Sequence, residues 1–175
     1  MYAKILFICL LLLPQFAAAL SYTLQITEQE LQQKVSRELP LEREAAYLAA
    51  KIYESRVDFI EGTDQVGLST KFDLLALGSI KSSGQAYVKG SVIYNPEKGA
   101  FYLINPSIVS VEINDMPPDF IPEIKRIALL SLEKAVQVYP IYKFKDEEIQ
   151  EKMARSVVES IQIKKQTMLI TMKLL

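Results

Sequence analysis

The feature that most constrains the fold is a set of unusually long segments in which apolar and polar residues alternate. The clearest example is VGLSTKFDLLALGS, residues 66–79, where one row of alternate positions is apolar and the other is mostly polar. Such alternation is typical of a β-strand with one buried side and one solvent-facing side. The segment is about twice as long as a common strand of about 5–6 residues. A long apolar row therefore needs an equally long cover.

Neighbouring stretches show the same pattern and are joined by tight connections. Residues 51–59, 86–94 and 101–113 each alternate apolar and polar side chains, and the last two flank the turn sequence NPEKG. Ile52 and Tyr53 are both apolar and predict a bulge, whereas Pro106 predicts a bulge or a strand edge. The alanine-rich residues before Lys51 are compatible with helix or strand. Long strands in direct succession predict an antiparallel meander.

Amphipathic helices are predicted on both sides of the meander. Thr27 and Glu30 have the spacing of a capping box, and the helix that follows carries a narrow apolar stripe up to Leu39. Residues 146–161 combine an acidic start with a stripe from Ile149 to Ile161, which predicts a C-terminal helix. Short strands are predicted at residues 22–26, 139–144 and 166–175.

The remaining helical segment, residues 120–139, is exceptionally apolar. Apolar side chains cover well over half of its surface, whereas a helix on the surface of a core needs an apolar stripe of only about 100°. We therefore expect this helix to be largely enclosed. Two interpretations remain open at this point. Helix and sheet form an ordinary filled core, or a curled sheet encloses the helix with more apolar lining than the protein itself fills.

The first nineteen residues have the layout of a secretory signal peptide. Lys4 precedes an unbroken apolar run at residues 5–13, and Ala17 and Ala19 supply the small residues of a cleavage site. The run is shorter than the ~20 residues that span a bilayer, which disfavours an uncleaved anchor. Cys9 is the only cysteine and lies inside this run, where it is badly placed for a lipoprotein anchor. Residues 20–175 are expected to form one exported domain.

The composition leaves few candidates for catalysis or nucleic-acid binding. The chain has no histidine, and its 20 basic and 21 acidic residues form no basic block. A histidine base and a Cys/His zinc site are therefore excluded. The sequence also lacks the basic patch that binding to a nucleic-acid backbone requires. Neither a glycine-rich phosphate loop nor a nucleophile elbow occurs. We expect no enzymatic activity, no cofactor and no metal.

Carboxylates are the remaining candidates for acid–base chemistry. Asp58, Asp73, Glu112 and Asp115 lie on polar rows of the predicted strands or in turns, where solvated side chains are the simpler interpretation. The acidic residues 146–148 have the composition of a calcium site. Their favourable position at a helix N-terminus explains them without a metal.

The order of these motifs resembles the YceB-like family of bacterial envelope proteins. The resemblance spans nearly the whole chain after residue 19 and is most specific at ITEQEL near its start and at EKGAFYL in the hairpin. That family is similar in fold to the tubular lipid-binding (TULIP) superfamily. The resemblance implies an α+β fold in which a long, strongly curved antiparallel sheet is wrapped around a long apolar helix, with additional N-terminal and C-terminal amphipathic helices.

The resemblance also implies a function, which is non-enzymatic binding of a lipid or another hydrophobic molecule in the periplasm, with membrane association as a further expectation. The family offers no catalytic residues to transfer, and its acylated cysteine has no counterpart here. The alternative is an envelope scaffold or protein-interaction module with a filled core and no ligand. The candidate apolar lining comes from two strands and the long helix: Val66, Leu68, Phe72, Leu74, Val88, Val92, Tyr94, Ile124, Ala128, Leu132 and Ala135.

Overall fold

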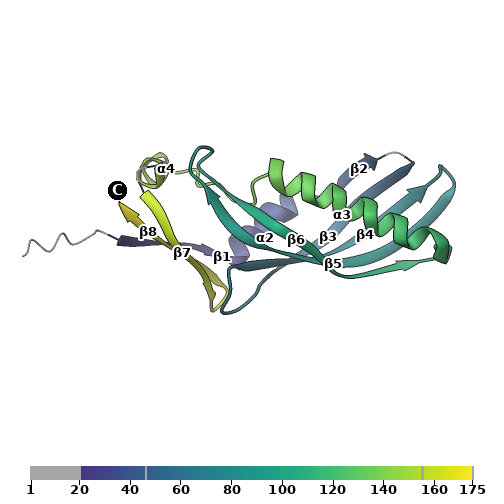
Figure 1. The fold of residues 1–175 in the computed structure, drawn as a ribbon, viewed down its shortest axis with the longest axis horizontal. Coiled ribbons are helices and arrows are strands. Elements are labelled where there is room, and N and C mark those ends of the chain that lie inside the picture. The colour runs from purple at the N-terminus through teal and green to yellow at the C-terminus, as the bar shows by residue number, and fades with distance from the viewer. Residues whose placement is uncertain (1–20, 46, 155, 175) are drawn as a thin grey trace, which may run out of the picture.

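The structure is a computed structural model that describes residues 21–45, 47–154 and 156–174. The predicted signal peptide and Cys9 lie outside the described residues. Within them the chain is an α+β protein with two open antiparallel sheets and three α-helices, α2 (Glu28–Arg37), α3 (Ile121–Val138) and α4 (Glu147–Ala154). Figure 1 shows an elongated molecule, with the smaller sheet and α4 at one end and α3 lying along the larger sheet toward the other.

The larger sheet has five strands and confirms the predicted meander. Its order follows the chain: β2 (Leu41–Ala45), β3 (Leu48–Phe59), β4 (Gln65–Ala76), β5 (Ile80–Asn95) and β6 (Ala100–Asn114). All neighbouring strands are antiparallel. The alanine-rich segment forms strand rather than helix because Ala49 and Ala50 pair with Leu75 and Leu74 of β4. Pairing with a long neighbouring strand outweighs the modest helix preference of alanine.

Both predicted bulges occur. The register of β3 against β4 shifts between Tyr53 and Arg56, and Glu54 takes a positive φ of 48° there. The register of β5 against β6 shifts at two places, one that includes Asn105 and Pro106 and one at Val109, and Asn105 has a φ of 50°. Each bulge adds unpaired backbone to one strand and increases its local twist.

The smaller sheet has the order β1 (Ser21–Thr27), β8 (Thr167–Leu174) and β7 (Ser156–Lys164), so it joins strands from both ends of the described chain. The predicted C-terminal helix is wrong beyond Ala154, because residues 156–164 form β7. Ile161 and Ile163 pair with Ile170 and Met168 of β8. Their β-branched side chains suit a pleated sheet better than a helix. The predicted strand at 139–144 is reduced to one bridge between Tyr142 and Phe101.

The N-terminal helix α2 is confirmed together with its capping box. The Thr27 hydroxyl accepts a hydrogen bond from the Glu30 amide at 3.2 Å, and the Glu30 carboxylate accepts one from the Thr27 amide at 2.8 Å. The helix lies along the part of β3 that β2 leaves unpaired. There the Gln32 side chain accepts a hydrogen bond from the Val57 amide at 2.7 Å and donates one to the Ser55 carbonyl at 2.9 Å. A side chain thus replaces a neighbouring strand at this edge.

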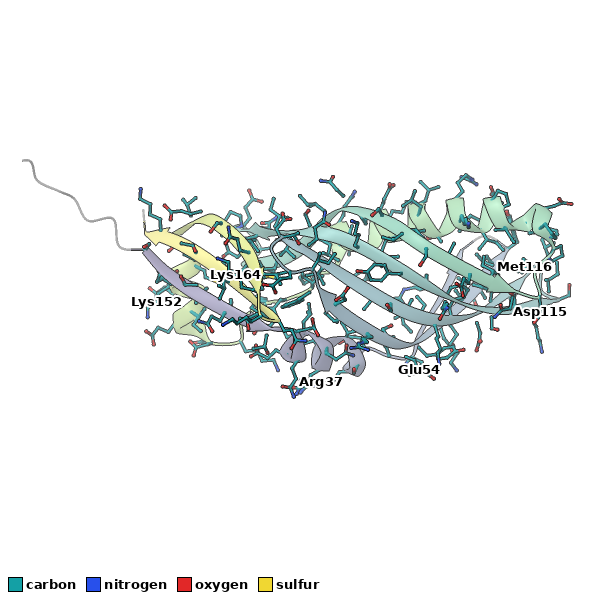
Figure 2. All side chains as sticks on the ribbon, turned by 90° about the horizontal axis from the view of Figure 1, so that it is seen from below. Arg37, Glu54, Asp115, Met116, Lys152 and Lys164 are labelled. Atoms are coloured by element: carbon teal, nitrogen blue, oxygen red, sulfur yellow. The ribbon has the colours of Figure 1, made fainter. Side chains whose placement is uncertain are left out.

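The buried apolar residues form two separate clusters. The basal cluster joins the smaller sheet, α2 and α4 to the nearer half of the larger sheet, and the distal cluster joins the far half of the larger sheet to the start of α3. The basal cluster contains Ile26, Leu31, Val57, Phe59, Val66, Val92, Tyr94, Phe101, Phe144, Met153, Ile163, Met168, Ile170 and Met172. The distal cluster contains Leu48, Phe72, Leu74, Ala76, Met116 and Ile124. In Figure 2, Met116 lies near the distal end of the molecule and Lys152 near the basal end.

The expectation that the long helix is enclosed is wrong. Only Ile124 and Val136 of α3 are buried, whereas Leu130 and Val138 are 45% and 62% exposed. The sheet is open and lies on one side of α3, so none of the described elements covers the opposite side of the helix (Figure 1). The apolar excess on α3 is therefore surface rather than core.

Candidate functional site

The candidate site lies on the inner face of the larger sheet, which is the face that carries the two clusters and α3. Paired residues of neighbouring strands point to the same face. Val57, Leu68, Val88 and Ile108 are paired in this order across β3, β4, β5 and β6. Val57 belongs to the basal cluster and Leu68 packs against it, but Val88 and Ile108 do not take part in either cluster. The inner face therefore changes from packed core to partly exposed surface along one row of residues.

The central part of α3 has the same character. Ala128 is exposed although it lies one helical turn from Ile124, which is buried in the distal cluster. Leu129, Leu132 and Ala135 are only partly buried and take part in neither cluster. We call the partly exposed apolar residues between the two clusters the middle apolar surface: Val88, Ile108, Ala128, Leu129, Leu132 and Ala135.

The structure divides the predicted lining among three places. Val66, Val92 and Tyr94 are buried in the basal cluster, with Leu68 packed against it. Phe72, Leu74 and Ile124 are buried in the distal cluster. The third group, which belongs to the middle apolar surface, consists of Val88, Ala128, Leu132 and Ala135.

Sequence reasoning missed Ile108 and Leu129. Ile108 lies on a strand that was predicted, but the bulges of β6 change which of its residues face inward. Counting alternate residues from the turn at residues 95–99 therefore does not predict which side of the sheet the Ile108 side chain is on. Leu129 belongs to the apolar pattern of α3. Only its position on the side of the helix that faces the sheet could have identified it as a lining residue.

The outer face of the larger sheet is polar, and its carboxylates have structural partners. The Tyr87 hydroxyl donates to Asp58 at 2.8 Å and the Tyr53 hydroxyl to Asp73 at 3.1 Å. A Cβ atom at Gly67 would lie 2.3 Å from the Tyr87 hydroxyl, so glycine is needed for the ring to lie there. Desolvation, followed by the hydrogen bond to Asp58, raises the pKa of Tyr87 to about 12. Asp58 and Asp73 thus each accept a hydrogen bond from a tyrosine of the same sheet.

Glu112 accepts a hydrogen bond from Gln85 at 2.6 Å on the same sheet. Asp115 lies beyond β6 and lines a pocket of about 540 Å³ with polar and apolar residues of β2 to β5. A second pocket of about 500 Å³ lies between the start of α2, β3 and the turn from β7 to β8, and Arg56 and Lys165 line it. Neither pocket includes a residue of α3.

In the part of the chain that the structure describes, the aspartate and glutamate side chains form no group that could hold a metal ion. None of the helices in this part is long and apolar enough to cross a membrane.

The fold and the site define a class of α+β protein in which a helix lies on one face of an open antiparallel sheet and leaves apolar surface between two packed clusters. The chain belongs to the family described as "protein of unknown function (DUF1439)", whose model matches residues 26–167. The match extends from β1 to the start of β8 and so includes α2, α3 and α4. No curated protein matches the chain.

Proposed function

We propose that this protein binds a lipid or another hydrophobic small molecule on the middle apolar surface, without catalysing a reaction. The observation that carries the proposal is the incomplete burial of Val88, Leu132 and Ala135 between two well-packed clusters. Apolar residues of facing elements are normally buried against each other. An acyl chain placed there would gain about 0.8 kcal/mol for each methylene that leaves water.

The proposed setting is the periplasm of a bacterial cell. It is supported by the signal-peptide pattern of residues 1–19 and by the resemblance to the YceB-like family and the tubular lipid-binding superfamily. In that superfamily lipid tails lie between a curved sheet and a helix. The proposed site uses the same two kinds of element, with an open sheet on one side of α3.

Native mass spectrometry of gently purified protein tests the proposal directly. We expect bound lipid before delipidation, and uptake of a fluorescent fatty acid or phospholipid after it. A delipidated, folded protein that takes up neither probe would overturn the proposal. A protein partner recovered by cross-linking, with no ligand detected, would instead support the scaffold alternative.

Matched variants locate the site. Leu132→Phe enlarges a residue of the middle apolar surface and is expected to reduce probe uptake, because the added ring occupies space needed by the ligand. Leu130→Phe makes the same change on the exposed side of α3 and is expected to leave uptake unchanged. Equal uptake by both variants would place any bound lipid elsewhere.

A further inference from the structure

Lys34, which forms no ion pair with any described carboxylate, lies where α2 meets the segment that follows α3. The Lys34 ammonium is 3.6 Å from the ring centroid of Tyr142 and donates a hydrogen bond to the Lys143 carbonyl at 3.1 Å. Tyr142 is in turn paired with Phe101 at the start of β6. α2 lies along the free edge of β3, and Tyr142 pairs with β6 at the opposite edge of the larger sheet. The contact between Lys34 and Tyr142 therefore connects the two edges of this sheet at the basal end of the inner face.

Lys145 adds positive charge near Lys34, because it follows by two residues the Lys143 carbonyl that Lys34 contacts. Lys34 is half-buried, and its pKa is lowered, first by desolvation and then by the positive charge of Lys145. Glu30 is the acidic group that opposes this shift, and its carboxylate is already bonded to Thr27 in the capping box. Among the described residues, neither Lys34 nor Lys145 forms an ion pair with a carboxylate. Partly buried charges are usually paired. Lys34 contacts a ring and a carbonyl but no carboxylate, so it retains capacity for an anion, and the exposed Lys145 adds a second positive charge nearby.

We propose that the hydrophobic ligand carries an anionic headgroup, a carboxylate or a phosphate, and that Lys34 and Lys145 bind this headgroup while the acyl chain lies on the middle apolar surface. The inference rests on the proposed function and names the chemical class of its ligand. The short segment after α3 limits the distance from the end of the helix to Lys143 to about the length of an acyl chain. Lys143 follows Val138, the last residue of α3, by five residues, which span at most about 18 Å. An acyl chain reaches across about half of the ~30 Å hydrocarbon core of a bilayer.

Two ligands with the same chain and different headgroups test the inference. Hexadecanoate and hexadecanol are titrated against delipidated protein by displacement of a fluorescent probe. We expect the wild type to prefer hexadecanoate, and this preference to weaken with added salt because the headgroup contact is partly exposed. Removing both ammonium groups in Lys34→Gln/Lys145→Gln is expected to lower hexadecanoate affinity by about tenfold or more, since a charged hydrogen bond contributes at least that factor. Hexadecanol affinity should change by less than about twofold.

Control variants separate this role from a structural one. Lys145→Gln alone removes a charge without touching the Lys34–Tyr142 contact, and it should lower hexadecanoate affinity while leaving the melting temperature unchanged. Lys125→Gln changes an exposed lysine at the other end of α3 and should alter neither affinity.

Three results would overturn the inference. Equal binding of hexadecanoate and hexadecanol by the wild type would leave the proposed function intact and remove the headgroup site. Binding of inorganic phosphate that depends on Lys34 and Lys145 and does not compete with hexadecanoate would show an anion site unrelated to the apolar ligand. Binding of neither amphiphile would overturn the proposed function as well.

Discussion

The inner face of the larger sheet is buried to different extents at the basal and distal ends of the molecule. At the basal end, the smaller sheet, α2 and α4 cover the inner face of the larger sheet from several sides, and Ile163, Ile170 and Met172 are completely buried. At the distal end, the described elements that cover the sheet are α3 and the short segment before it, which contributes Met116 and Phe120. The residues there are buried less completely, and much of α3 remains exposed.

The difference shows that long strands do not by themselves create a closed core. Each strand of the meander presents an apolar row along its whole length, but burial depends on how many elements lie against that row. One helix can cover only a strip of a wide sheet, because an α-helix with its side chains is about 10–12 Å across while neighbouring strands are ~4.8 Å apart. The middle apolar surface lies where the cover changes from several elements to α3 and the short segment before it.

The largest expected effect is at the centre of the basal end. Ile170→Ala removes a completely buried side chain from the middle strand of the smaller sheet and is expected to lower the free energy of unfolding by about 2–5 kcal/mol. Urea denaturation measures this change. Val157→Ala on the exposed side of β7 is the control and should cost less than about 0.5 kcal/mol. A loss below about 1 kcal/mol at Ile170 would contradict the tight packing of this end.

Overpacking compares the distal cluster with the middle apolar surface. Leu74→Phe adds volume where Leu74 is buried in the distal cluster and is expected to cost about 1–3 kcal/mol. Leu132→Phe adds the same volume on the middle apolar surface and should cost much less, because its surroundings are not closed. The two variants are compared by urea denaturation of delipidated protein. Equal costs would show that the middle of the molecule is as tightly packed as the cluster.

Between the basal and distal ends, Gln32 of α2 satisfies the backbone groups at the free edge of β3. Gln32→Ala leaves the Val57 amide and the Ser55 carbonyl without their partner, and we expect a loss of about 1–2 kcal/mol because both contacts are only partly buried. Hydrogen exchange should also become faster at the Val57 amide. Gln33→Ala, an exposed change on the same helix, should have neither effect.

The smallest effect concerns Tyr87, on the outer face that both ends share. Tyr87→Phe removes the hydrogen bond to Asp58 and is expected to cost about 0.5–1.5 kcal/mol at neutral pH. The raised pKa means that the folded protein retains a proton that the unfolded chain loses from about pH 10. The stability contributed by Tyr87 is thus complete below pH 10 and is lost as the pH rises toward about 12.

Denaturation of wild type and Tyr87→Phe over this pH range checks the prediction. The difference in the free energy of unfolding between the two proteins should shrink as the pH rises. A constant difference would show that the phenol has an ordinary pKa.

Local sequence predicted the elements whose signals lie within one segment. The capping box of Thr27 and Glu30 predicted the start of α2, and the alternation in residues 66–79 predicted β4. The turn at residues 95–99 predicted the hairpin between β5 and β6. These signals depend on backbone hydrogen bonding and side-chain period over a few residues, which a sequence displays directly. The segment at 156–164 was predicted wrongly because Val157 and Ile161 are spaced by one helical turn and also suit a strand.

The sequence by itself determined that this protein has long two-faced strands, a capped first helix and an unusually apolar second one. Only the tertiary structure decided which apolar residues are core and which are surface. Ile124 and Ala128 belong to the same stripe of α3, yet Ile124 is buried and Ala128 is exposed. The physical reason is that periodicity specifies the direction of a side chain, whereas burial depends on the elements that other parts of the chain place against it. The middle apolar surface is partly exposed because that cover is incomplete over the middle of the sheet.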